Sequence, residues 1–164
     1  MESNDFSKQI SKVDDDSKQM QIDCLKGDPG HGFDIDTIYY VENQWCVFEY
    51  LKCESDYVSP HSSDPNKYPK NWKKFHSLFQ IASKLNGCLI LVNYSIREKD
   101  RNEVKIMKVK NLNYELIKKY ESLPIQQRPR NLAYITYEWE KKMTFEKYSD
   151  WLRALNKKSK IYPF

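Results

Sequence analysis

Residues 33–53 read FDIDTIYYVENQWCVFEYLKC, and this stretch decides the fold. Phe33 to Val41 is rich in Ile, Tyr and Thr, and Trp45 to Cys53 is again β-branched and aromatic. Such residues favour strands. The polar residues Glu42 to Gln44 between the two runs indicate a turn. The stretch therefore predicts a β-hairpin.

Three carboxylates lie on this hairpin. Side chains alternate along a strand, so Asp34 and Asp36 share one face of the first strand. Glu49 stands in an apolar stretch, where burying a lone ionised carboxylate is costly. Carboxylates that converge from neighbouring strands suit Mg²⁺, which polarises phosphoryl oxygens and lowers the pKa of a bound water. We therefore expect Asp36 and Glu49 to bind a metal ion, with Asp34 as a further ligand.

A helix and a buried strand follow the hairpin. Residues 55–70 contain three prolines and predict an irregular loop. From Asn71 to Leu85 apolar residues recur every three or four positions, which is the period of a helix; Asn71 is its expected cap, and Gly87 is expected to end it in a left-handed conformation. Cys88 to Val92 is a continuous apolar run, typical of a central strand.

The remaining elements complete a mixed fold. The pattern indicates a short helix from Val13 to Cys24, strands at 103–109 and 131–140, a helix at 114–121 and a final helix capped by Thr144. We expect an α/β or α+β protein, in which helices flank a central mixed sheet. A single domain is expected over 1–164, with a core at about 13–110 and a C-terminal strand–helix extension at about 111–164.

This order of elements resembles the PD-(D/E)XK nuclease superfamily, whose fold occurs in restriction endonucleases and Holliday-junction resolvases. In that superfamily an Asp on one hairpin strand is followed by Glu/Asp-x-Lys on the next, and then by a helix. Asp36 matches the Asp and Glu49, thirteen residues later, matches the acid. The resemblance covers roughly residues 13–95. It implies a restriction-endonuclease-like core, a Mg²⁺ or Mn²⁺ cofactor and DNA as substrate, with a homodimer as a further partner to test.

The lysine departs from the superfamily pattern. The family spacing places it at position 51, where this chain has Leu51, and the neighbouring lysine is Lys52. On a regular strand Lys52 points away from Glu49, but a β-bulge would bring it back. Alternatively Lys73 or Lys74 supplies the charge from the following helix, or the site is degenerate. In the superfamily the first helix often contributes a further acid to the site. Here Asp23 or one of residues 14–16 would have to serve as that acid.

Charge is distributed unevenly along the chain. Residues 1–60 carry five lysines against 13 acids, whereas residues 61–164 carry 22 basic residues against 10 acids. Such a division suits an acidic site beside a basic, phosphate-binding surface, although scattered solvated charges give the same totals. The candidate nucleic-acid-binding residues follow the hairpin: Lys70, Lys73, Lys74, Gln80 and His61.

Several function classes are disfavoured. No apolar run approaches the roughly 20 residues that a membrane span needs, and residues 1–11 are too polar for a secretory signal, so we expect a soluble, cytoplasmic protein without a membrane partner. The four cysteines lack paired spacing, which favours reduced thiols over a disulfide framework or a zinc site. No phosphate-binding glycine loop, dinucleotide fingerprint or serine-hydrolase motif occurs.

The leading hypothesis is therefore a metal-dependent endonuclease that hydrolyses phosphodiester bonds in DNA. Asp36, Glu49 and Lys52 are the expected catalytic residues, and Asp36, Glu49 and Asp34 the expected metal ligands. The alternative is a catalytically inactive module of the same fold that binds nucleic acid or a protein. A third reading is a small interaction protein with an aromatic surface near Trp139.

Overall fold

The computed structural model describes residues 15–30 and 32–159, which belong to two units divided after Gly32. The first unit contains helix α1 (Asp16–Leu25), in which no residue is buried. Val13 and Asp14, which the sequence places in or beside this helix, lie outside the described residues. All other elements belong to the second unit, Phe33–Phe164.

The hairpin forms as expected, with a shorter first strand. Strands β1 (Thr37–Val41) and β2 (Gln44–Lys52) pair in antiparallel fashion. The turn is two residues long, and Glu42 and Asn43 both have positive φ, at 52° and 65°. Two such residues give the turn a twist that matches the twist of the strands. Residues 33–36 precede β1 instead of forming part of it.

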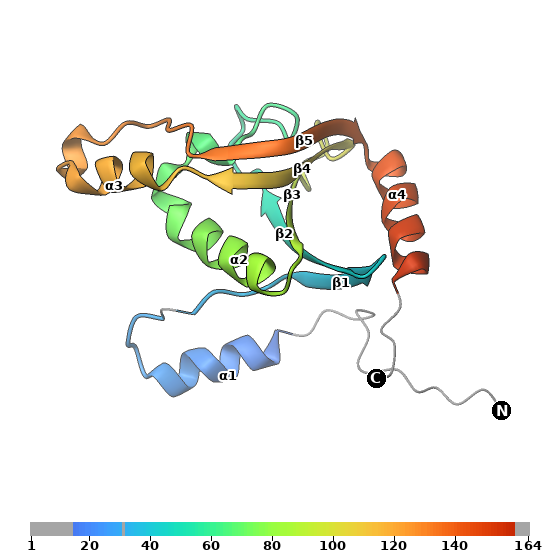
Figure 1. Cartoon of the computed structure of the whole chain (residues 1–164), viewed down its shortest axis with the longest axis horizontal. Coiled ribbons are helices and arrows are strands. Elements are labelled where there is room, and N and C mark those ends of the chain that lie inside the picture. Colours follow the sequence, from blue (N-terminus) through green and yellow to red (C-terminus); the bar gives the residue numbers. More distant parts are fainter. Residues whose placement is uncertain (1–14, 31, 160–164) are drawn as a thin grey trace. The chain divides into compact units, whose positions relative to one another are not determined.

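A five-stranded mixed sheet organises the second unit (Figure 1). Its strands lie in chain order, β1-β2-β3-β4-β5. Only β2 and β3 (Cys88–Tyr94) are parallel, and a parallel neighbour requires a crossover, which α2 (Trp72–Lys84) provides. The other elements are β4 (Glu103–Leu112), α3 (Tyr114–Ser122), β5 (Ile135–Thr144) and α4 (Phe145–Lys158). The protein is thus of the α+β class, and the C-terminal extension adds directly to the sheet.

Each face of the sheet carries its own hydrophobic cluster. On the face that we call the α2 face, Val47, Leu91 and Met107 pack against residues of α2 and α3 such as Leu78 and Ile117. The opposite face, the α4 face, contains the buried residues Phe48, Cys88, Ile90, Val92, Val104, Ile106 and Tyr148. Helix α4, red in Figure 1, runs from the end of β5 back to β1. Trp139, Tyr148 and Trp151 meet in this cluster.

The ends of α2 differ from the prediction. Asn71 is the first flanking residue, but its side chain makes no capping hydrogen bond. Asn86, with φ 53°, takes the left-handed conformation that we expected of Gly87. Gly87 is needed for a different reason, because a Cβ atom there would lie 2.2 Å from the carbonyl oxygen of Trp45. By contrast, Thr144 caps α4 as predicted, accepting a hydrogen bond from the Lys147 amide at 3.3 Å.

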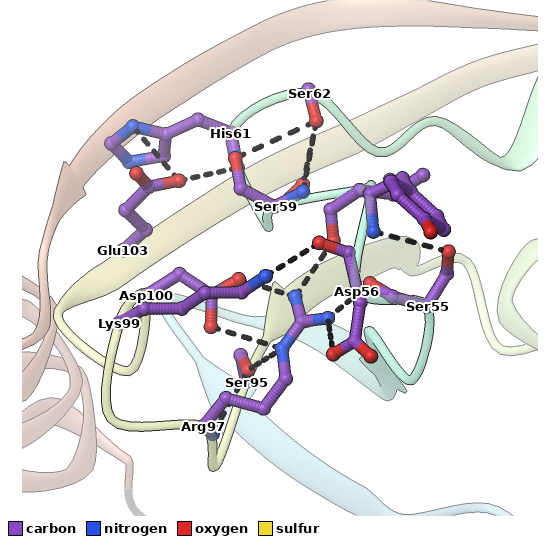
Figure 2. Close-up of polar contacts among 12 residues, drawn as sticks. Ser55, Asp56, Ser59, His61, Ser62, Ser95, Arg97, Lys99, Asp100 and Glu103 are labelled. Carbon is purple, nitrogen blue, oxygen red and sulfur yellow. Dashed lines mark hydrogen bonds and ion pairs between the residues drawn. The ribbon is translucent and has the colours of Figure 1, made fainter.

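The connection from β2 to α2 is held in place by side chains of β3, β4 and the turn between them. It is not wholly irregular, since Pro65–Lys67 and Pro69–Asn71 form short 3₁₀ helices. Arg97 donates to the carbonyls of Ser55 and Val58 and pairs with Asp100 (Figure 2). These bonds order the loop, none of whose residues belongs to either hydrophobic cluster.

A second set of bonds fixes the middle of this loop. Lys105 of β4 is only 4% exposed, and its Nζ lies 3.2 Å from the Ser63 carbonyl and 3.4 Å from Asp64. Asn93 of β3 donates to the carbonyls of Pro60 and Ser63. The polar residues under the loop thus satisfy backbone groups that would otherwise be buried unpaired.

Candidate functional site

Asp36 and Glu49 meet at the open end of the hairpin. The register pairs Thr37 with Phe48, so Asp36, one residue before β1, lies opposite Glu49. Asp36 is exposed, and its Oδ2 accepts a hydrogen bond from the Tyr50 amide at 2.7 Å. That bond fixes the Asp36 carboxylate beside β2.

Glu49 is a buried carboxylate with one oxygen unsatisfied. Its side chain points to the α2 face together with Val47 and Leu51, and it is 2% exposed. Oε1 pairs with the ammonium of Lys74, which α2 brings over the sheet. Oε2 is buried and has no hydrogen-bond partner. A buried carboxylate oxygen without a partner is costly, and a proton or a cation would satisfy it.

The protonation of Glu49 reflects these surroundings. Burial raises the pKa of Glu49 to about 7, although the hydrogen bond and charge of Lys74 act in the opposite direction. The negative charge of Asp36 raises the pKa of Glu49 further. Glu49 is therefore able to exchange a proton, or to exchange that proton for a metal ion, close to neutral pH.

Lys52 does not join the two carboxylates. The pairing of β2 with β3 is unbroken from Cys46–Cys88 to Lys52–Tyr94, so no bulge turns Lys52 toward Glu49. Strand alternation puts Lys52 on the α4 face, and Leu51 occupies the position on the side of Glu49. Of the alternatives drawn from the sequence, the structure brings Lys74 to Glu49.

The remaining candidates lie in other surroundings. Asp34 is exposed and precedes β1. Lys70 is exposed just before α2, and Lys73 is exposed in its first turn, where it lies over the ring of Trp72 at 5.9 Å. Gln80 donates to the hydroxyl of Tyr114 at 3.1 Å, so its amide is engaged with α3.

His61 contacts strands β4 and β5 instead of the hairpin. Its Nε2 lies 3.0 Å from the Met143 carbonyl, and its Nδ1 lies 3.6 Å from Glu103 (Figure 2). Of the acids considered on the first helix, Asp15, Asp16 and Asp23 belong to the separate N-terminal unit, and Asp14 lies outside the described residues.

Two protein carboxylates are enough for one kind of metal site. Across residues 15–30 and 32–159, no group of three or more His, Cys, Asp or Glu is placed to hold a metal ion. Mg²⁺, however, is commonly held by one or two carboxylates, with water and substrate phosphates as its other ligands. The unpartnered Oε2 of Glu49 and the neighbouring Asp36 fit such a site, because a cation would satisfy the oxygen and relieve the repulsion.

A pattern in the sequence distinguishes Lys74 from Lys73 as the lysine that reaches Glu49. Lys74 precedes the buried residue Leu78 by four positions, which places both on the inner side of α2. Lys73 falls about 100° away around the helix. The bond from the Tyr50 amide to Asp36 has no such signal, since it depends on the strand register.

Comparison of the chain with protein-family models, curated proteins and solved structures finds no significant match. In the described part of the chain no helix is both long and apolar enough to span a membrane.

Proposed function

We propose that this protein is a metal-dependent endonuclease that hydrolyses phosphodiester bonds in DNA. The observation that carries the proposal is the meeting of Asp36, Glu49 and the Lys74 ammonium. Two acids and a lysine are the side chains of the PD-(D/E)XK pattern, and here the lysine comes from α2 instead of β2. A nuclease core with a relocated lysine accounts for both the resemblance and the departure from it.

Asp36 and Glu49 would hold Mg²⁺ or Mn²⁺. When bound, such an ion polarises a phosphoryl oxygen and lowers the pKa of a water ligand. The carboxylate of Asp36 is kept in place by the Tyr50 amide, so little reorganisation is required when a cation arrives. Asp34, directly before the hairpin, remains the proposed further ligand.

Lys74 is suited to a role at the phosphate. Its side chain is 35% exposed, so the ammonium contacts both the buried Glu49 and the solvent from which a substrate arrives. There it would orient the attacking water or stabilise the negative charge that develops on the phosphate. This is the role that the sequence assigned first to Lys52.

DNA binding would use the basic start of α2. Lys70 and Lys73 are exposed within four residues of Lys74. Lysines in such a position contact phosphates and therefore orient a duplex without reading its sequence.

A catalytically inactive module is the second candidate, and the burial of Glu49 favours it. A carboxylate that is 2% exposed and paired with a lysine also has the features of a structural ion pair. The two candidate functions differ in whether Asp36 and Glu49 bind a metal ion that supports DNA cleavage.

The test is cleavage of supercoiled and linear DNA with Mg²⁺ or Mn²⁺ by the natural chain and by Asp36→Asn, Glu49→Gln and Lys74→Met variants. Lys84→Ala, at the exposed end of the same helix, is the matched control. We expect cleavage to need the metal, to fall about 10²-fold or more in each site variant and to be unchanged in the control.

Binding of Mn²⁺, followed by electron paramagnetic resonance, separates the two candidates. A nuclease binds Mn²⁺ in a manner that Asp36→Asn and Glu49→Gln abolish. An inactive module shows neither cleavage nor site-dependent Mn²⁺ binding. Cleavage that persists in both carboxylate variants would contradict the proposed site.

A further inference from the structure

Two cysteines that are distant in sequence face each other across β2 and β3. Cys46 and Cys88 occupy directly paired positions in the parallel ladder. Their sulfur atoms are 3.5 Å apart, and the thiol of Cys88 donates to Sγ of Cys46. Both belong to the α4 face, on the side of the sheet opposite to Glu49. This pair takes no part in the proposed nuclease site.

The close approach of the two strands at this point depends on Gly87. With a side chain at this position, the Cβ atom would meet the carbonyl oxygen of Trp45 at 2.2 Å. Because glycine has no Cβ, the start of β3 can lie against the residue before Cys46. The backbone thus holds the two thiols side by side in the folded state.

The two thiols have different electrostatic surroundings. The Cys88 hydrogen bond lowers the pKa of Cys46, and the positive charge of Lys108 does so too, although burial opposes them. Donating that bond, together with burial, raises the pKa of Cys88. Lys108 is held in place by Glu138, at 2.9 Å. One thiol is therefore prepared to act as a nucleophile while its neighbour keeps its proton.

We propose that Cys46 and Cys88 form a redox modification site that hydrogen peroxide oxidises to an intramolecular disulfide. The thiolate of Cys46 attacks one oxygen of the peroxide, whose O–O bond breaks, and the other oxygen leaves as water after taking up a proton. Cys46 becomes a sulfenic acid. The thiol of Cys88 then displaces the hydroxyl group, which leaves as a second water with the Cys88 proton. Two thiols are oxidised by two electrons and one peroxide is reduced to two waters.

The fold accommodates this bond. Neighbouring strands lie about 4.8 Å apart. A disulfide requires its Cα atoms to be roughly 4.4–6.8 Å apart, so paired positions on adjacent strands fall within its range. The backbone does not need to open for the second step, and a resolving thiol next to a reactive one is typical of redox-sensing cysteines.

The other two cysteines provide internal comparisons. Cys24 is exposed in the N-terminal unit. Cys53 is buried in the second unit, and burial raises the pKa of its thiol. Selective oxidation of Cys46 and Cys88 in the presence of these two thiols would reflect the paired geometry instead of exposure or burial alone.

The experiment uses the full-length protein, reduced and then treated with hydrogen peroxide before free thiols are alkylated. Peptide mapping by mass spectrometry without reduction is expected to show the Cys46 peptide linked to the Cys88 peptide, with no disulfide between separate chains. This measurement requires no variant. A chain whose Cys24 is oxidised while Cys46 and Cys88 remain alkylated as free thiols would overturn the proposal.

Single variants identify the order of events. In a Cys24→Ser background, which removes the exposed thiol, Cys88→Ala is expected to accumulate a sulfenic acid on Cys46 that dimedone traps. In Cys46→Ala, labelling of Cys88 is expected to be about tenfold slower than labelling of Cys46 in Cys88→Ala, because the thiol of Cys88 is buried whereas that of Cys46 is only partly buried. Equal labelling of the two cysteines, or disulfides that link only separate chains, would contradict the proposed pair.

Discussion

Glu49 lowers the stability of the fold when it is ionised, yet the proposed chemistry needs its carboxylate. A carboxylate placed among Val47, Leu51 and Leu91 costs stability whenever it is ionised, because water does not solvate it. Lys74 offsets part of that cost. The unpartnered Oε2 shows that the offset is incomplete. Residues with such an unbalanced environment concentrate at functional sites.

Stability is expected to fall with rising pH because of this residue. The pKa of Glu49 in the folded protein is about 7, against an ordinary 4.5, so the folded state binds the proton more tightly than the unfolded state. The stabilisation is fully present below pH 4.5 and is lost as the pH rises to 7. The free energy of unfolding of the natural chain relative to Glu49→Gln should fall by about 2–3 kcal/mol over this range. Chemical denaturation at several pH values measures it, and a constant difference would contradict the prediction.

Removing Lys74 is expected to be harmful mainly when Glu49 is ionised. Lys74→Met leaves a buried carboxylate without its cation, at a cost of about 2 kcal/mol at pH 8. At pH 5 the carboxyl group is protonated, and the cost should be smaller. Denaturation of the variant beside Lys84→Ala measures the difference. An equal loss at both pH values would mean that packing of the lysine stem, and not its charge, is what matters.

At the scale of elements, the crossover from β2 to β3 depends on one glycine. Gly87→Ala would place a methyl group 2.2 Å from a backbone oxygen, and backbone cannot move aside as a flexible side chain can. We expect a loss of about 2–4 kcal/mol in the free energy of unfolding. Gly32→Ala is the matched control, since nothing lies within 4 Å of a Cβ at that position. Similar stability of the two variants would exclude the close approach.

The loop before α2 is expected to depend on Arg97. This guanidinium bonds the carbonyls of Ser55 and Val58, and no substituted side chain of similar size reproduces that geometry. Arg97→Ala should therefore expose residues 55–63 to proteolysis at least several-fold faster, with little change in the rest of the sheet. Arg101→Ala, an exposed arginine of the same turn, is the control. Equal rates of cleavage in the loop for the two variants would show that other contacts hold it.

Prediction from the sequence succeeded for elements with a strong local pattern. The hairpin, α2, the buried strand at Cys88 and the Thr144 cap each follow from the period or from the chemistry of a few neighbouring residues. The left-handed residue after α2 was misplaced, because glycine has two uses and the pattern does not distinguish conformational freedom from close approach.

The candidate site could be predicted only in part, because a local pattern does not show which elements come into contact. Spacing along a strand shows that Lys52 points away from Glu49 unless the strand is bulged. It does not show that α2 brings Lys74 to Glu49. The pairing of Cys46 with Cys88 was likewise hidden, because 42 positions separate the two and only the register of parallel strands aligns them.

At the scale of the whole molecule, the N-terminal unit is expected to be dispensable for the stability of the second unit. Every described residue between 15 and 30 is exposed, so this segment buries no core. A chain that begins at Phe33 should unfold within about 0.5 kcal/mol of the full-length protein in urea. A larger loss would show that the first unit contributes to the core after all.

The order of the strands has a consequence for how the chain folds. In three of the four strand pairings the neighbours are joined by a two-residue turn, a short connection or the connection that contains α3, so we expect each pairing to form without a large loss of chain entropy. Only β2 and β3 must wait for the connection of residues 53–87 to close. Asp36 and Glu49 belong to the pairing with the shortest connection, and Lys74 lies within the longest. We therefore expect the two acids to meet early in folding, and the buried carboxylate to acquire its cation only when the slowest closure is complete.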